Sequence, residues 1–179
     1  KTVRSAQLAT MLMGIVIFFD DYANTLIVGP TMRPLTDKKR ISREKLSYIV
    51  DSTAAPVAGM AAISTWIGYE LGLIGDSLTS VGIEGVNSYS AFFSSIPFRF
   101  YSLFTLVMVF AIGFLVKDFG PMYKAEKRAR LTGKVLDDNA NPMFSEDFEK
   151  DLDQKDIPLK MRNALVPILV MIILAFVGL

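Results

Sequence analysis

The sequence of 179 residues contains no cysteine and no histidine. Without cysteine a thiolate metal site is excluded, and without histidine a histidine-ligated zinc centre cannot form. Proton chemistry must therefore use aspartate and glutamate side chains. The sequence also contains no recognisable pairing of a nucleophile with a base and no set of metal ligands. These absences predict a protein that is not an enzyme and has no resident cofactor.

Apolar residues are abundant, at 51% of the sequence, while 21% of the residues are charged. The mean hydropathy of +0.38 is too high for an ordinary soluble domain, yet the charge is too high for a bare bundle of helices. Membrane spans separated by polar loops fit both figures, so we predict an all-α, polytopic membrane protein. Because the sequence starts at Lys1 and ends within an apolar run, 166–179, we expect an interior piece of a larger protein.

Two adjacent carboxylates, Asp20 and Asp21, lie between the apolar runs 6–19 and 26–32. Together, residues 6–32 exceed the ~20 residues that a helix needs to cross a bilayer. A charge at that depth costs at least ~2.5 kcal/mol and usually marks an ion or proton pathway. We therefore predict a first span that is broken near residues 20–24 and holds a cation site. The alternative is a short helix that ends at the membrane surface.

A second apolar segment, residues 46–74, contains Asp51, Ser52 and Thr53, with Pro56 just after them. Proline removes a backbone donor and disfavours helix at the residue before it, which predicts an interruption at 51–56. The alternative is that Asp51 ends a short surface helix. Paired interrupted segments are the best sequence indication of a transporter site, so we expect the two breaks to lie close together.

Basic residues gather in two segments, 33–45 and 117–134, with six in each. Short basic loops face the cytoplasm, which predicts cytoplasmic loops at 33–45 and 117–162. Between them we expect a short surface helix at 88–96 and a third span at 98–116, with Arg99 at its outer interface. No aromatic or glycine-rich pattern accompanies the basic residues, so nucleic acid is not an expected partner.

The remaining organisation follows from composition. Residues 1–134 form the expected transporter core, with membrane spans at about 6–32, 46–74 and 98–116. Residues 135–162 are acidic and poor in apolar side chains, which is typical of a solvated linker. A calcium loop is the sharper alternative for this stretch, but the EF-hand spacing and its glycine are missing. A further transmembrane helix begins in residues 163–179.

Several stretches resemble the NhaC-type sodium/proton antiporter family, within the wider ion-transporter superfamily. They are Phe19–Thr25, Gly29–Pro34, Ile41–Pro56 and Asp118–Met122, followed by Glu126 and Arg128. The resemblance covers much of residues 18–130 but not the acidic insert. It implies an inverted-repeat secondary transporter in the bacterial inner membrane that exchanges cytoplasmic protons for sodium by alternating access. It also implies a chain more than twice this length, with membrane lipid and the missing helices as partners, and leaves homodimerisation open.

On this interpretation, Asp20 and Asp21 alternate between sodium and protons. Burial disfavours the charged form of a carboxylate, and bound sodium competes with its proton. Neutral oxygens, which suit a hard cation, would come from four residues: Asn24, Thr25, Ser52 and Thr53. Asp51 is either a third ligand or a partner of a helix end.

Two other functions remain open. The first is an ion-coupled exchanger of organic acids, such as malate and lactate, or of amino acids. It needs an anion site, whereas Arg99 is expected at the interface. The second is a membrane subunit without transport, whose carboxylates would be paired internally. Neither broken span contains a lysine or arginine for such pairing.

Overall fold

The computed structural model describes residues 2–140 and, beyond them, residues 162, 166, 169, 170, 173, 174 and 177. The chain divides into two units, Lys1–Asp138 and Asn139–Leu179. Most of the expected acidic linker, 135–162, lies outside the described residues. The described positions from residue 162 onward are helical, and the rest of the expected span at 163–179 also lies outside them.

Helices make up all the regular structure of the first unit, as expected for an all-α protein. Its elements in chain order are α1 (Val3–Val16), α2 (Asp21–Lys38), α3 (Arg43–Ala58), α4 (Thr65–Ser80), α5 (Ser88–Ser95), the 3-10 helix η1 (Ile96–Phe98), α6 (Phe100–Leu115) and α7 (Gly120–Thr132). Among the described residues, one helical stretch is long and apolar enough to cross a membrane by length and composition. This stretch, Phe100–Thr132, includes α6 and α7, while α1 is a shorter apolar helix.

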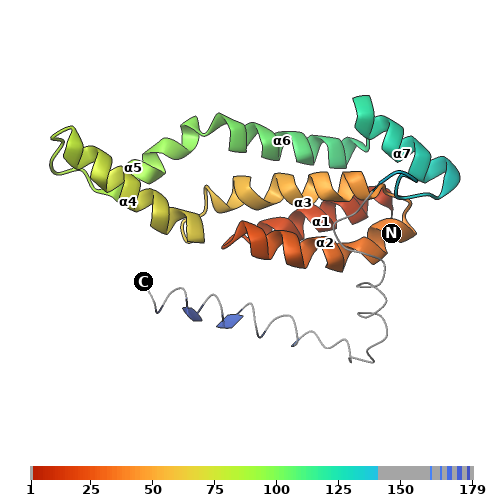
Figure 1. Cartoon of the computed structure of the whole chain (residues 1–179), viewed down its shortest axis with the longest axis horizontal. Helices are drawn as coiled ribbons and strands as arrows, with labels where there is room; N and C mark the ends of the chain where they lie inside the picture. The colour runs from red at the N-terminus through yellow and green to blue at the C-terminus, as the bar shows by residue number, and fades with distance from the viewer. Residues whose placement is uncertain are drawn as a thin grey trace. The chain divides into compact units, whose positions relative to one another are not determined.

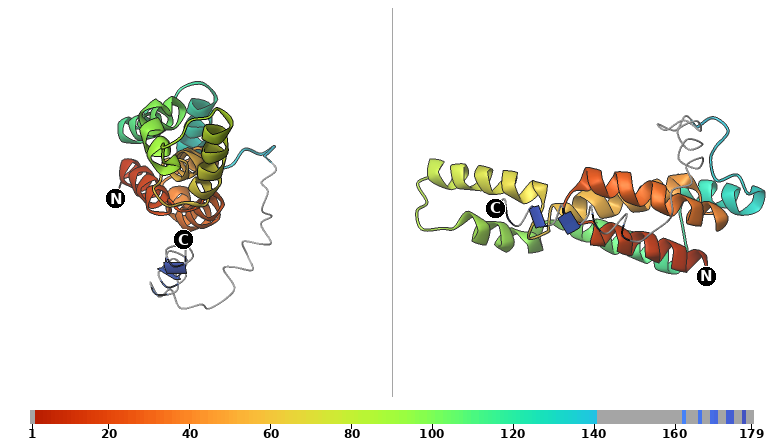
Figure 2. Two further views of the ribbon diagram at one scale, coloured as in Figure 1. Left: turned by 90° about the vertical axis from the view of Figure 1, so that its left-hand side faces the viewer. Right: turned by 90° about the horizontal axis from the view of Figure 1, so that it is seen from below.

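The first apolar segment folds back on itself, which differs from the single crossing expected for residues 6–32. Helix α1 ends at Val16, and α2 returns alongside it (Figures 1 and 2). The break occupies residues 17–20, slightly earlier than expected, because Asp20 caps α2 and so starts the helix. Its backbone is extended, and its carboxylate accepts a hydrogen bond of 2.7 Å from the backbone N–H of Ala23. Such capping is the usual role of aspartate at a helix start.

The interruption expected at residues 51–56 is wrong. Helix α3 runs unbroken to Ala58, with Pro56 in its last turn. Proline lacks the N–H that bonds to the carbonyl four residues earlier, yet α3 continues for two residues beyond Pro56 before it ends. The interruption of this segment lies instead at residues 59–64, between Gly59, which caps α3, and Ser64, which caps α4.

Helix α3 is the centre of the packing in the first unit, since it contacts α1, α2, α6 and α7. Helix α3 runs beside α6 in Figure 1, and α6 also contacts α1 directly. The side chains of Met11, Ile49 and Val109, from α1, α3 and α6, form a layer with no exposed area. Helices α4 and α5 pack on one another, and α5 confirms the short helix expected at 88–96. The packing of these helices therefore holds α1, α2 and α3 around the break at residues 17–20.

Candidate functional site

The two helix interruptions meet in space, although the second lies at 59–64 instead of 51–56. The backbone N–H of Thr65 donates to the carbonyl of Phe19 at 2.9 Å. The Thr65 hydroxyl donates to Oδ2 of Asp20 at 3.0 Å. The first turn of α4 is therefore bonded directly to the turn between α1 and α2.

Both carboxylates lie at this junction and are partly exposed. Oδ1 of Asp20 caps α2, while Oδ2 binds Thr65. Oδ1 of Asp21 accepts a hydrogen bond of 3.0 Å from the indole Nε1 of Trp66. The first turns of α2 and α4 thus adjoin the two aspartates, and the positive end of a helix dipole stabilises nearby negative charge. The site holds two carboxylates through neutral donors, with no lysine or arginine among their hydrogen-bond partners in the described part of the chain.

Asn24 is a deeply buried member of the predicted ligand set, at 1% exposed. Its Nδ2 lies within hydrogen-bonding distance of three carbonyl oxygens, those of Gly14 (2.5 Å), Ile17 (3.0 Å) and Thr53 (3.3 Å). These three acceptors fix the orientation of the amide. Its Oδ1 is buried and has no hydrogen-bond partner in the described structure. An unsatisfied buried acceptor costs about 1–3 kcal/mol, so this oxygen is a strong candidate to receive a cation or a water.

The remaining predicted residues divide between the interior and the surface. Ser52 and Thr53 are buried in α3, where the Thr53 hydroxyl donates to the carbonyl of Ile49 at 2.8 Å. Thr25 is exposed, and its hydroxyl donates to the carbonyl of Asp21 at 3.0 Å. Asp51 is also exposed. Within the described part of the chain, no three acidic side chains gather as a metal-binding group, so Asp51 does not join the aspartate pair.

Arg99 has a role that the sequence did not reveal. Instead of lying at the interface alone, its Nη1 donates to the carbonyl of Gly59 at 2.6 Å and to Oε1 of Glu70 at 3.1 Å. Its guanidinium also lies over the ring of Phe92, 4.5 Å from the centroid. Arg99 therefore ties the end of α3 to α4 across the second interruption. The available signal was that Arg99 is the single basic residue of the sequence between positions 46 and 116, and a charge in apolar surroundings usually has a partner.

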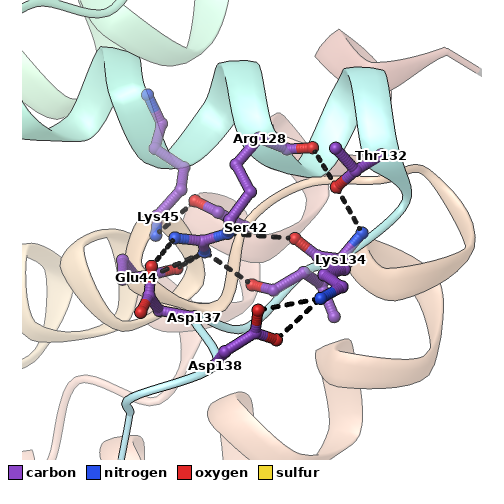
Figure 3. A network of polar contacts seen from close by, with 9 residues as sticks. Ser42, Glu44, Lys45, Arg128, Thr132, Lys134, Asp137 and Asp138 are labelled. Carbon is purple, nitrogen blue, oxygen red and sulfur yellow. Dashed lines mark hydrogen bonds and ion pairs between the residues drawn. The ribbon is translucent and has the colours of Figure 1, made fainter.

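The two basic segments are joined to each other at the other end of α3. Arg128 of α7 binds both carboxylate oxygens of Glu44, at 2.8 and 2.9 Å, and also pairs with Asp137 (Figure 3). Beyond α7, the side chain of Lys134 hydrogen-bonds to Asp138 and thereby lowers the pKa of that carboxyl. These contacts place residues 43–45 and 128–138 at the same end of the first unit, which agrees with the expectation that both basic segments share one side.

Lys45 differs from the solvated loop residue that its basic neighbours suggested. Its side chain has no exposed area, and its ammonium forms an ion pair with Asp118, whose side chain is 3% exposed. The buried pair joins α3 to the segment between α6 and α7. The sequence assigned this lysine to a cytoplasmic loop, and only the fold shows that it is an interior residue.

Comparison with known proteins gives two matches. The sequence profile of the Na+/H+ antiporter family matches residues 57–179, a range that begins near the end of α3 and does not include Asp20 and Asp21. An uncharacterized protein of Haemophilus influenzae is 36% identical over 173 residues, which are 97% of this chain and 31% of that protein. The chain thus spans about a third of the length of that relative. No solved structure matches.

Proposed function

Since this chain belongs to the Na+/H+ antiporter family, we propose that the whole protein exchanges sodium ions for protons, with Asp20 and Asp21 as the coupling carboxylates. The observation that carries this proposal is the position of the two aspartates where two helix interruptions adjoin. Interrupted helices leave backbone groups and helix ends beside the site, as transporter ion sites require. Membership of a transporter family also supports a function that is not enzymatic.

The exchange follows from competition at one site. We propose that one proton and one sodium ion compete for the oxygens of the adjacent carboxylates Asp20 and Asp21. A sodium ion that enters the site favours the doubly ionised form and releases this proton. The net charge of the site is then the same before and after the exchange, because one positive charge replaces another. Alternating access to the site completes the antiport cycle.

Asn24 supports the same site from the interior. It lies one turn along α2 from Asp20, and its backbone N–H donates to the carbonyl of Asp20 at 3.0 Å. Its unpaired Oδ1 is a neutral oxygen of the kind that a hard cation prefers. The carbonyl of Thr53 holds its Nδ2, so α3 contributes to the site by orienting Asn24. We propose that Thr25, Ser52 and Asp51 are secondary to this arrangement.

One observation bears on the alternative function, which is the exchange of organic acids. It needs a cation that faces the substrate, and Arg99 was the candidate in the apolar part of the chain. Because Arg99 binds Glu70 and the carbonyl of Gly59, its charge is already engaged. This pairing favours inorganic ion exchange. A subunit without transport is disfavoured because Asp20 and Asp21 bind neutral donors instead of basic partners.

The family and the apolar stretch of α6 both indicate a membrane protein. We place it in the bacterial inner membrane, with residues 33–45 and 117–162 on the cytoplasmic side. The shared basic character of residues 33–45 and 117–134, and the ion pair between Glu44 and Arg128, support this orientation. The rest of the full-length protein would supply the other half of the ion site.

Proton flux in vesicles that contain the full-length protein tests the proposed function. Sodium, potassium, lithium, malate and lactate are offered in turn while the internal pH is followed. Antiport predicts proton movement with sodium chloride and none with the organic acids as potassium salts. Proton movement that requires malate or lactate would contradict the proposal and support the organic-acid exchanger.

A further inference from the structure

The partners of the two aspartates are all hydrogen-bond donors. Asp21 accepts from the indole Nε1 of Trp66, and Asp20 accepts from the hydroxyl of Thr65, each at 3.0 Å. Both donors come from the first turn of α4. Trp66 is the single tryptophan of the chain.

A donor hydrogen and a cation require the same feature of a carboxylate, its oxygen lone pairs. An ionised carboxylate accepts through two oxygens, so each donor that is bound removes part of the coordination open to a cation. The indole N–H can only donate, which means that it cannot become a ligand when sodium arrives. The Thr65 hydroxyl could rotate and offer its oxygen, but Trp66 can only compete or leave.

The position of Trp66 permits such movement. Trp66 is 40% exposed, so the indole borders solvent and is not enclosed by the bundle. In contrast, the residues that flank the second interruption, 59–64, are held together, because Arg99 binds both the carbonyl of Gly59 and the carboxylate of Glu70. Glu70 lies one turn after Trp66 on α4, which leaves the first turn as the part of the helix that contacts the carboxylates.

We propose that Trp66 competes with the transported cation for Asp21, so that its indole N–H occupies the carboxylate in the cation-free site and withdraws when sodium binds. This inference rests on the proposed function, because it assumes that sodium binds at Asp20 and Asp21. It adds that Trp66 sets the apparent affinity for sodium. A residue that only supported the site would act in the opposite direction, since its loss would weaken sodium binding.

The test replaces the donor and keeps an aromatic ring. In vesicles with the full-length protein, Trp66→Phe should lower the sodium concentration that gives half-maximal proton release by about tenfold, the usual weight of a hydrogen bond to a charged group. Tyr69→Phe is the matched control, because Tyr69 is an exposed aromatic residue on the same helix, and its half-maximal concentration should not change. An unchanged or raised half-maximal concentration in Trp66→Phe overturns the inference.

A second variant guards against misfolding. Thr65→Val keeps the shape of the side chain and leaves the indole on Asp21, so a general loosening of the first turn of α4 would appear in both variants. Because the Thr65 hydroxyl can also offer its oxygen to sodium, Thr65→Val should not show the tenfold fall of Trp66→Phe. Titration of the purified protein with sodium chloride in a calorimeter gives the same comparison without transport. The wild-type protein and Asp21→Asn are measured in parallel. If the wild-type protein neither releases protons with sodium nor binds sodium, the proposed function fails. If the wild type does both, and only the Trp66 and Thr65 variants differ from expectation, then the proposed competition by Trp66 is wrong while the proposed function stands.

Discussion

Gly14 of α1 faces Thr53 of α3 so closely that a methyl group on Gly14 would overlap the threonine hydroxyl. Thr53 is fully buried, so it has no room to move aside. Asn24 hydrogen-bonds to the carbonyls of both residues, which means that the close approach of the two helices also positions the amide of the proposed site.

Replacement of Gly14 by alanine should therefore force α1 and α3 apart. We expect Gly14→Ala to destabilise the protein by about 1–3 kcal/mol, the usual cost of overpacking, and to reduce sodium-dependent proton release. The matched control is Gly29→Ala in α2, where nothing lies within 4 Å of the added methyl group. Thermal unfolding of the detergent-solubilised protein compares the two variants, and equal melting temperatures would refute the role given to Gly14.

The buried pair of Lys45 and Asp118 should contribute mainly to stability. Asp118→Asn leaves the ammonium of Lys45 in the interior without its counter-charge, which typically costs about 3–5 kcal/mol. The control is Asp138→Asn, because Lys134 and Asp138 form an ion pair that is largely exposed. Thermal unfolding should show a clear loss for Asp118→Asn and almost none for Asp138→Asn. The double variant Lys45→Met with Asp118→Leu should recover stability; if it is no better than Asp118→Asn, the charge is not the cause.

Arg99 and Glu70 should behave as one unit that secures the second interruption. Arg99→Gln removes the bonds to Glu70 and to the carbonyl of Gly59, and hydrogen bonds to charged groups contribute about 1.5–3 kcal/mol each. We expect impaired sodium-dependent proton release, whereas Arg4→Gln on the exposed surface of α1 should have little effect. Exchange of the two charges, Arg99→Glu with Glu70→Arg, should restore more activity than either single change retains. Additive losses would show that the pair does not act together.

The sequence was sufficient to predict the helical class, because apolar runs of helical length and capping residues are local signals. Ser42 caps the start of α3, and Asn87 caps the start of the short helix α5. The aspartate pair was also correctly placed at a break, since two charges within an apolar run conflict with a continuous span. The predictions that were wrong concerned the residues at which helices end, and they were made from the local sequence alone. Pro56 was interpreted as a breaker from local propensity, which tertiary packing routinely overrides, and α3 packs against four other helices.

The tertiary partners were beyond the reach of the sequence. Nothing local shows that α2 returns along α1, because Asn24 finds the carbonyl of Gly14 only after the chain has reversed. For the same reason the pairing of Trp66 with Asp21, forty-five positions apart, was not foreseen. Lys45 was grouped with its basic neighbours because charge alone does not distinguish a solvated lysine from one that has a buried partner.

Sodium-dependent proton release by Asp20→Asn and Asp21→Asn tests the central claim most directly. Asparagine caps a helix as well as aspartate does, so Asp20→Asn can keep the bond from the Ala23 N–H and Asp21→Asn the bond from Trp66 while the charge is removed. The new amide nitrogen of Asp20→Asn can donate to the Thr65 hydroxyl, which is able to rotate and accept. The control is Asp76→Asn, an exposed residue of α4. In vesicles with the full-length protein at equal amounts, the account predicts that each aspartate variant loses exchange while the control retains it. Normal exchange with unchanged pH dependence in both aspartate variants would contradict it.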